Sequence, residues 1–131
     1  MMDEVLFVSR ETMGMAWPLC RPFIVHAVNK CGDWTIEQVE RLLTLPTAAL
    51  WIATRNDIVI ATAVTEIDGD QCKIVALGGM GGPDWRCLLQ PLEKYAKSMA
   101  CARMRVEGRS GWQKVLPDYH QPYVVLEKRL D

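Results

Sequence analysis

The residues best suited to ligand chemistry form a short glycine-rich stretch in the middle of the chain, Gly78-Gly79-Met80-Gly81-Gly82. We call residues 78–82 the glycine turn. It follows an apolar run and precedes a helical pattern, and a strand that passes through glycines into a helix exposes backbone N–H groups. Such a turn suits a phosphate or pyrophosphate. Glycine pairs also serve simply to reverse the chain, so both interpretations stay open.

The charge distribution around this turn is uneven, although the net charge is only -1. Residues 85–114 carry seven basic and two acidic side chains, which gives this segment +5 and the rest of the chain -6. A positive surface beside the glycine turn would attract an anionic cofactor, whereas the plainer interpretation is a solvated helix face and strand edge. The lack of an overall basic excess or a binding motif argues against a nucleic-acid partner.

Few side chains in the sequence are suited to proton transfer or metal binding. Glu66, near the end of a predicted strand, is a candidate general base, although a solvent-facing carboxylate is the commoner outcome at such a position. The five cysteines show no CxxC spacing, and neither histidine stands at ligand spacing from a cysteine or from the other histidine. We therefore expect reduced cysteines and no metal site.

The bulk composition predicts a single domain that spans residues 1–131. The chain is 50% hydrophobic and 24% charged, so it has enough apolar side chains to form one core. At 131 residues it is too short for two domains. The first residues are acidic where a signal peptide needs basic ones, and no apolar run approaches the ~20 residues that span a bilayer. These features predict a soluble cytoplasmic protein without a membrane partner.

The first part of the chain predicts a short strand and two helices. The strand covers residues 5–8. Pro18 and Pro22 then mark a break in regular structure, and Pro22 begins a predicted helix over residues 22–30. The second helix follows a capping box in which Thr35 and Gln38 stand three residues apart, and Pro46 ends it. We expect both helices to cover one sheet.

Three apolar, β-branched runs follow, at residues 49–54, 58–67 and 72–77. The short polar turns between them, at residues 55–57 and 68–70, predict hairpins. The three strands should therefore form an antiparallel meander whose last strand leads into the glycine turn.

The segment after the glycine turn predicts a helix and a strand. Asp84 is a suitable N-cap, but Pro91 would cost ~3 kcal/mol in a helix interior, so we expect a kink or a later helix start. Residues 103–107 alternate as a strand does, and the intervening helix favours parallel pairing with residues 72–77. A short helix at residues 111–116 and a last strand at residues 123–128 complete the prediction.

This order of elements resembles the GNAT acyl-CoA N-acyltransferase superfamily over nearly the whole chain. Three shorter stretches, LEKYA at 92–96, GRSGWQKVL at 108–116 and VLEK at 125–128, look like the small GNAT-fold proteins of tailed phages and prophages. The resemblance implies an α/β (α+β) fold. Its sheet is mixed and mostly antiparallel, with one parallel, splayed strand pair and helices on both faces.

The resemblance also implies a cofactor and a site. Acetyl-CoA or another acyl-CoA would lie between the splayed strands, and its acyl group would pass to an amine of a small molecule or protein. The implied cofactor-binding residues are Gly79, Met80, Gly81, Gly82, Trp85, Arg86 and Arg109. The backbone of the turn and of the helix start would hold the pyrophosphate, and either arginine would assist the phosphates.

The sequence departs from the superfamily pattern at two places. Pro83 and Trp85 fall where the usual loop has glycines, and the bulky indole would narrow the pyrophosphate site. The tyrosine that often serves as an acid aligns with Trp112, which cannot transfer that proton. Tyr119 is the nearest substitute proton donor to the thiolate, and core packing is its alternative role.

Two hypotheses follow from these observations. In the first, the protein is an N-acyltransferase in which Glu66 deprotonates an amine and Tyr119 protonates the leaving thiolate. In the second, the fold is catalytically inactive and serves as a binding or phage assembly module with a phage protein partner. The resemblance makes a homodimer plausible in either case. The loop from Gly78 to Arg86 distinguishes the two, since open amides favour the enzyme and a gap filled by Trp85 favours the module.

Overall fold

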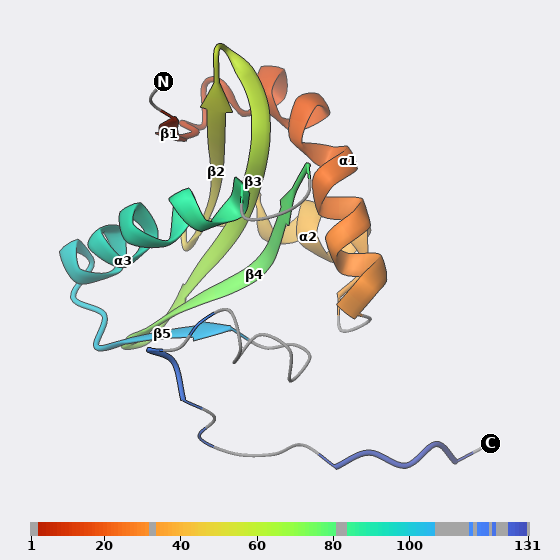
Figure 1. The fold of residues 1–131 in the computed structure, drawn as a ribbon. Coiled ribbons are helices and arrows are strands. Elements are labelled where there is room, and N and C mark those ends of the chain that lie inside the picture. Colours follow the sequence, from red (N-terminus) through yellow and green to blue (C-terminus); the bar gives the residue numbers. More distant parts are fainter. Residues whose placement is uncertain are drawn as a thin grey trace.

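The computed structural model describes residues 3–31, 34–80, 84–106, 116, 118–120, 122 and 126–130. These residues form a five-stranded sheet in the order β1-β2-β3-β4-β5, with helices on both faces (Figure 1). The strands are β1 (Glu4–Phe7), β2 (Ala48–Arg55), β3 (Ile58–Asp68), β4 (Gln71–Gly79) and β5 (Arg103–Val106). Within the described ranges, no helix has the length and apolar character that crossing a membrane requires.

The predicted meander is confirmed. β2, β3 and β4 pair in antiparallel fashion, and β1 extends the sheet antiparallel to β2. The first hairpin turns at Asn56 and Asp57, whose φ angles of 54° and 64° are those of a two-residue turn matched to strand twist. β5 pairs with β4 in parallel, as the intervening helix predicted.

The first helix is longer than predicted. α1 spans Met13–Cys31 and contains both Pro18 and Pro22, so the predicted start at residue 22 was wrong. The two prolines are four residues apart and exposed, so the carbonyls that lose their helical partners lie on the solvent side. The opposite side is buried, and this burial stabilises one continuous helix despite the prolines.

The other helix boundaries follow local chemistry. α2 (Ile36–Leu42) begins with the predicted capping box, in which the Gln38 N–H donates to Thr35 Oγ1 at 3.1 Å and the Thr35 N–H donates to Gln38 Oε1 at 2.9 Å. After the glycine turn, a 3₁₀ segment, η1 (Asp84–Leu88), precedes α3 (Leu89–Ser98). Pro91 therefore lies in the first turn of α3, where its missing N–H breaks no helical bond. The predicted later start is confirmed.

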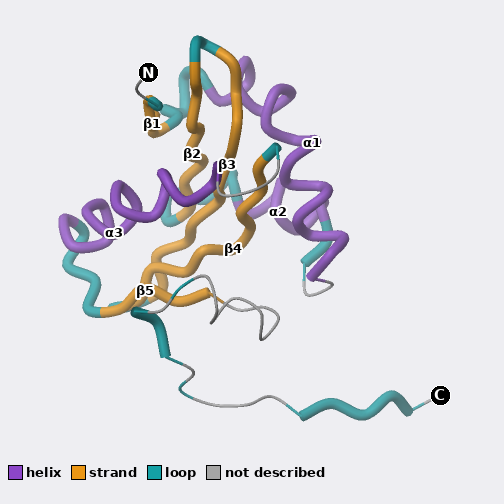
Figure 2. Tube along the Cα trace, in the orientation of Figure 1, coloured by secondary structure: helices purple, strands orange, loops and turns teal. Residues whose placement is uncertain are grey.

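Two cores separate the layers of the fold, and Figure 2 shows helices on both sides of the strands. α1 and α2 cover one face through the buried side chains of Cys20, Ile24 and Val39, and we call this the first core. η1 and α3 cover the other face with Leu88 and Leu92, and we call this the second core. Alternation along the strands supplies both cores with apolar groups.

The last predicted elements are only partly testable. The short helix predicted at residues 111–116 and the first half of the strand predicted at residues 123–128 lie mostly outside the described residues. Residues 126–130 are described and form no strand, so the strand prediction was wrong for its second half. This segment lies away from the sheet (Figure 1), where Leu126 and Leu130 find no apolar surface to cover them.

Candidate functional site

The candidate site lies at the edge of β4 where β4 and β5 part. The two strands pair from Gln71 opposite Arg103 to Ile74 opposite Val106, and no described residue continues the ladder. In Figure 1 the described part of β5 ends while β4 continues past it. Among the described strands, the second half of β4 therefore pairs with β3 alone.

A β-bulge explains why β4 turns away at this point. Val64 pairs with Ala76 and Thr65 with Ile74, so Val75 is an extra residue in β4. Both Val75 and Ala76 pack against the first core. A bulge bends the strand that contains it, and this one follows directly after the last pair with β5.

Backbone N–H groups point into the open edge beyond the bulge. The Met80 N–H donates to the Ile60 carbonyl at 3.0 Å, which fixes the pattern of hydrogen bonding between β3 and this end of β4. In an antiparallel ladder alternate residues face opposite edges, so the N–H groups of Leu77 and Gly79 point away from β3. These two amides are directed toward the same edge of β4 that pairs with β5 farther back along the strand.

α1 forms a wall against this part of β4. A Cβ on Gly78 would lie 2.6 Å from the carbonyl oxygen of Phe23, so only glycine allows α1 to pack this closely. Gly78 therefore serves packing between helix and strand. A Cβ on Gly79 would lie 3.6 Å from the Trp85 backbone nitrogen, which shows that η1 returns close to the end of β4.

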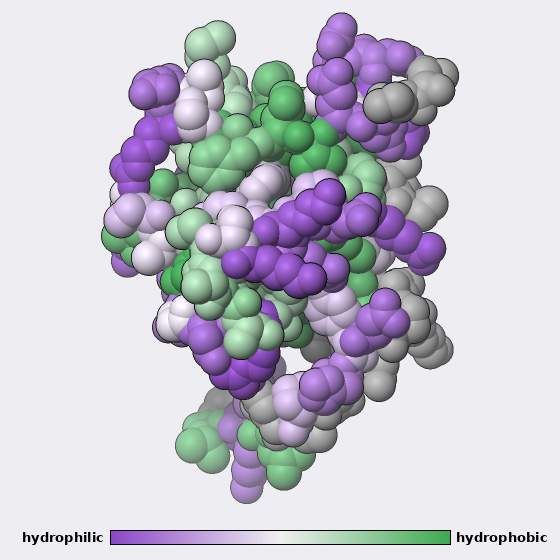
Figure 3. Space-filling view, turned by 90° about the vertical axis from the view of Figure 1, so that its left-hand side faces the viewer, coloured by the Kyte–Doolittle hydropathy of each residue, from purple (hydrophilic) through white to green (hydrophobic). Residues whose placement is uncertain are grey.

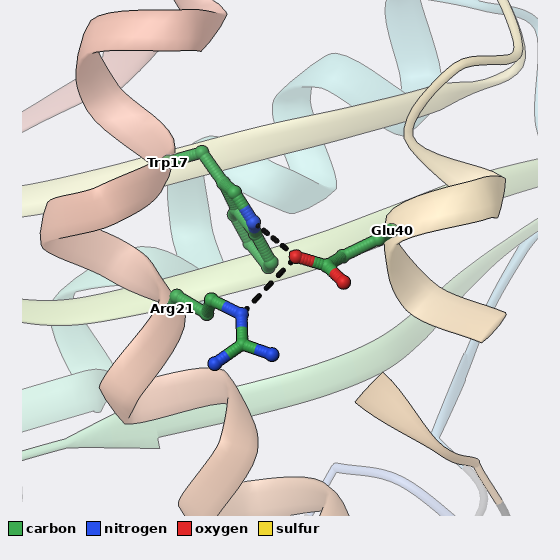
Figure 4. Close-up of polar contacts among 3 residues, drawn as sticks. All are labelled: Trp17, Arg21 and Glu40. Carbon is green, nitrogen blue, oxygen red and sulfur yellow. Dashed lines mark hydrogen bonds and ion pairs between the residues drawn. The ribbon is translucent and has the colours of Figure 1, made fainter. Parts of the chain in front are cut away.

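α2 holds this wall in place through one carboxylate. Glu40 Oε2 accepts a hydrogen bond from Trp17 Nε1 at 2.7 Å and an ion-paired bond from Arg21 Nε at 3.1 Å (Figure 4). The Trp17 hydrogen bond, with the Arg21 contact second, lowers the pKa of Glu40. Since Trp17 and Arg21 are one turn apart on α1, the carboxylate links the two helices.

The predicted loop residues are only partly described. Met80 uses its N–H on Ile60 and exposes its side chain, while Gly81, Gly82 and Arg109 lie outside the described residues. Pro83 and Trp112 are outside them as well.

Trp85 and Arg86 lie in η1, the 3₁₀ segment that precedes α3. Trp85 is half-buried and packs against the second core, and η1 lies against β2, β3 and β4. The exposed Arg86 guanidinium stands 5.7 Å from the centre of the indole ring. The indole thus contributes to the packing of η1 on the sheet, and the exposed Arg86 guanidinium lies beside this indole.

The predicted base is remote from the turn. Glu66 lies on β3 opposite Lys73, five residues beyond Ala61, which pairs with Gly79. Five residues of extended strand cover ~16 Å. The structure therefore does not bring Glu66 together with the glycine turn.

The predicted acid is engaged with a helix. Tyr119 Oη donates to Glu93 Oε2 on α3 at 2.7 Å, and the ring is half-buried. Burial, followed by the Glu93 hydrogen bond, raises the pKa of Tyr119. A phenol whose proton is held this way is a poor donor to a thiolate, so the contact favours the packing role that the sequence left open.

Sequence reasoning missed the three features that shape this edge: the bulge at Val75, the amides of Leu77 and Gly79, and the contact of Gly78 with Phe23. Only Gly78 had a usable signal, because a glycine inside a strand pattern often marks a bulge or a close backbone approach. Backbone N–H groups carry no sequence signature.

Comparisons with known proteins identify the fold. A scan against protein-family models finds no match, and a search of curated proteins finds none. Among solved structures, AAC(6')-Iy in complex with the bisubstrate analogue CoA-S-monomethyl-acetylneamine has a TM-score of 0.74 at 12% identity, covering 100% of this chain and 99% of that one. The fold is that of the GNAT acetyltransferases.

Other GNAT-fold structures agree along the whole chain. The ribosomal-protein-alanine N-acetyltransferase of Brucella melitensis has a TM-score of 0.68 at 10% identity, covering 99% of this chain and 100% of that one. A predicted acetyltransferase from Clostridium acetobutylicum, solved with acetyl-CoA, has a TM-score of 0.65 at 15% identity, covering 99% and 96%. The fold class expected from the sequence is confirmed, including the parallel strand pair within a mostly antiparallel sheet.

Proposed function

We propose that the protein is an acyl-CoA-dependent N-acyltransferase, which transfers an acetyl or other acyl group from CoA to an amine. The observation that carries this proposal is the edge of β4 beyond Ile74, which no described strand pairs with and toward which the Leu77 and Gly79 N–H groups point. GNAT-fold structures with CoA-S-monomethyl-acetylneamine and with acetyl-CoA support it.

The residues around the open edge fit an extended ligand that bears carbonyl and phosphate groups. In the proposal, the Leu77 and Gly79 amides bind carbonyl oxygens of acyl-CoA, while Gly81, Gly82 and the start of η1 bind its pyrophosphate. In the same proposal Arg86, whose guanidinium lies over the Trp85 ring at the start of η1, would assist the phosphates. Acyl-CoA supplies the activated thioester, and a backbone N–H aimed at its carbonyl would polarise that bond.

The packing of Trp85 favours the enzyme over the inactive module. The indole is half-buried against the second core together with Leu88 and Ala61, so its surface is used in holding η1 to the sheet. The alternative, an inactive phage assembly or accessory module, drew on this indole filling the gap, on Pro83 at a glycine position and on Trp112 in place of the tyrosine acid.

Binding is tested by thermal unfolding with acetyl-CoA and with desulfo-CoA. A ligand at 100 times its dissociation constant adds ~2.7 kcal/mol to the free energy of unfolding, which raises the melting temperature measurably in a domain of this size. Gly81→Val should abolish the rise by placing a side chain where the pyrophosphate approaches. Gly14→Ala is the matched control, because a Cβ there meets nothing within 4 Å.

Transfer itself needs a second measurement, release of free CoA thiol in the presence of an amine. Aminoglycosides and peptides with an N-terminal alanine are the first acceptors to try, since structures similar to this chain include enzymes for both. No melting shift with either cofactor, from folded protein free of bound ligand, would favour the inactive module. The phage relationship, its protein partner and the cytoplasmic location stay predictions.

A further inference from the structure

α1 exposes large apolar side chains along one of its flanks. Met15 and Leu19 are 80% and 61% exposed, and Phe23, one turn after Leu19, is half-buried. Residues four apart lie on the same side of a helix, so these three side chains form a row, which we call the apolar flank of α1. A row of this kind is typical of a contact surface, whereas single exposed apolar residues are common.

The contacts of α1 show which way the apolar flank faces. Trp17 and Arg21 both bond the same carboxylate of α2, so one side of α1 is turned toward α2. Residues two apart are turned by ~200° around a helix, which places Leu19 and Phe23 on the opposite side. There the Phe23 carbonyl oxygen and Cβ lie 2.6 Å and 3.4 Å from the position of a Cβ on Gly78. The apolar flank therefore faces away from α2 and borders the second half of β4.

This position gives the apolar flank a role in the proposed acyl transfer, on which the inference rests. The proposed acyl-CoA lies along the edge of β4 toward which the Leu77 and Gly79 N–H groups point. Its phosphates would bind at the start of η1, which packs in the second core, whereas α1 covers the other face of the sheet with the first core. The cofactor therefore leaves the α1 side of this edge to the amine.

The charges of α1 and β4 indicate what kind of amine fits there. In these two elements the sequence has no Asp or Glu, and α1 carries Arg21 and Lys30. By contrast, α3 exposes Lys94 and Lys97, and Figure 3, which views the molecule from the side of α3, shows hydrophilic groups across its middle. An acceptor with several ammonium groups needs facing carboxylates to offset the loss of water. α1 and β4 offer such an acceptor none.

We propose that the acceptor is a primary amine with one apolar group, aromatic or branched aliphatic, which packs on Leu19 and Phe23. The apolar flank removes that group from water, and this burial selects it over a polar group on the same amine. In the transfer the amine nitrogen bonds to the thioester carbon and the carbon–sulfur bond breaks. The proton that the amine loses passes to the sulfur of CoA.

The first test compares acceptors in the thiol-release assay with acetyl-CoA. 2-Phenylethylamine and isopentylamine should give a kcat/KM about tenfold or more above that of ethanolamine or spermidine. A higher value for spermidine, or no release with either apolar amine from protein that acetyl-CoA stabilises, would overturn the inference alone. No release with any amine, from protein whose melting temperature does not respond to acetyl-CoA, would overturn the proposed function and the inference with it.

The second test changes the apolar flank itself. Leu19→Gln should raise the KM for 2-phenylethylamine about fivefold or more and leave the KM for acetyl-CoA unchanged. Leu45→Gln, the matched change of an exposed leucine after α2, should alter neither KM. Leu19→Glu supplies a carboxylate to α1 and should raise the kcat/KM for spermidine relative to 2-phenylethylamine by about tenfold. Wild-type preferences in both Leu19 variants, with melting temperatures close to that of the wild type, would overturn the inference.

Discussion

The close packing of α1 on β4 depends on the absence of a side chain at Gly78. Since a Cβ would approach the Phe23 carbonyl oxygen to 2.6 Å, Gly78→Ala must push α1 away from β4. We expect a loss of about 1–3 kcal/mol in the free energy of unfolding, measured by urea denaturation. Gly14→Ala, in the open, should be neutral or stabilising by up to about 1 kcal/mol, and equal losses in both variants would contradict the packing role.

Tyr119 gives a second prediction at this scale, with a defined pH dependence. Its pKa is raised on folding, so its contribution to stability is complete below pH ~10, the ordinary tyrosine value, and is lost as the pH rises above it. Tyr119→Phe should cost about 1–2 kcal/mol at neutral pH and reduce the alkaline loss. Urea unfolding between neutral and alkaline pH tests this, and an unchanged alkaline slope would contradict it.

The catalytic alternatives for Glu66 and Tyr119 are tested by the same transfer assay. Because Glu66 lies ~16 Å along β3 from the residue opposite Gly79, we expect Glu66→Gln to leave the rate of thiol release within about twofold. A hundredfold loss with an unchanged melting temperature would restore Glu66 as the base. The same result for Tyr119→Phe would restore the acid.

At the scale of elements, the contact between α1 and α2 should weaken at low pH. The pKa of Glu40 is lowered on folding, so its bonds to Trp17 and Arg21 stabilise the protein above pH ~4.5 and are lost as the pH falls through the lowered value. Glu40→Gln should lower the melting temperature at neutral pH, and this effect should shrink as the pH falls through the lowered pKa of Glu40. A double-mutant cycle with Trp17→Phe isolates the contact, and additive effects would show that the two residues do not interact.

The elements that the sequence predicted well are those set by local chemistry. The capping box at Thr35 and the alternation of the meander act within a few residues, and both are confirmed. α1 was misplaced because Pro18 and Pro22 are locally unfavourable, and only burial against the sheet overrides them. The Tyr119 bond to Glu93 joins residues 26 apart, so no spacing rule predicted it.

For the whole molecule, burial should determine which cysteine thiols react with a reagent in solution. Cys20 and Cys72 are fully buried, and burial raises the pKa of both thiols, that of Cys72 to about 11. Native protein at pH ~8 should therefore show at most three of its five thiols reacting rapidly with a disulfide reagent, and all five in urea. Rapid reaction of four or more native thiols would contradict the burial of Cys20 or of Cys72.

The loss of a single codon would remove the bulge in β4. Val75 is the extra residue, so its deletion leaves Ile74 opposite Thr65 and Ala76 opposite Val64, and every later side chain keeps its face. Removal of a single codon would thus straighten β4 beside β5 without shifting the register of the sheet. If the proposed function is right, we expect this one in-frame deletion to give a folded protein with weaker binding of acyl-CoA.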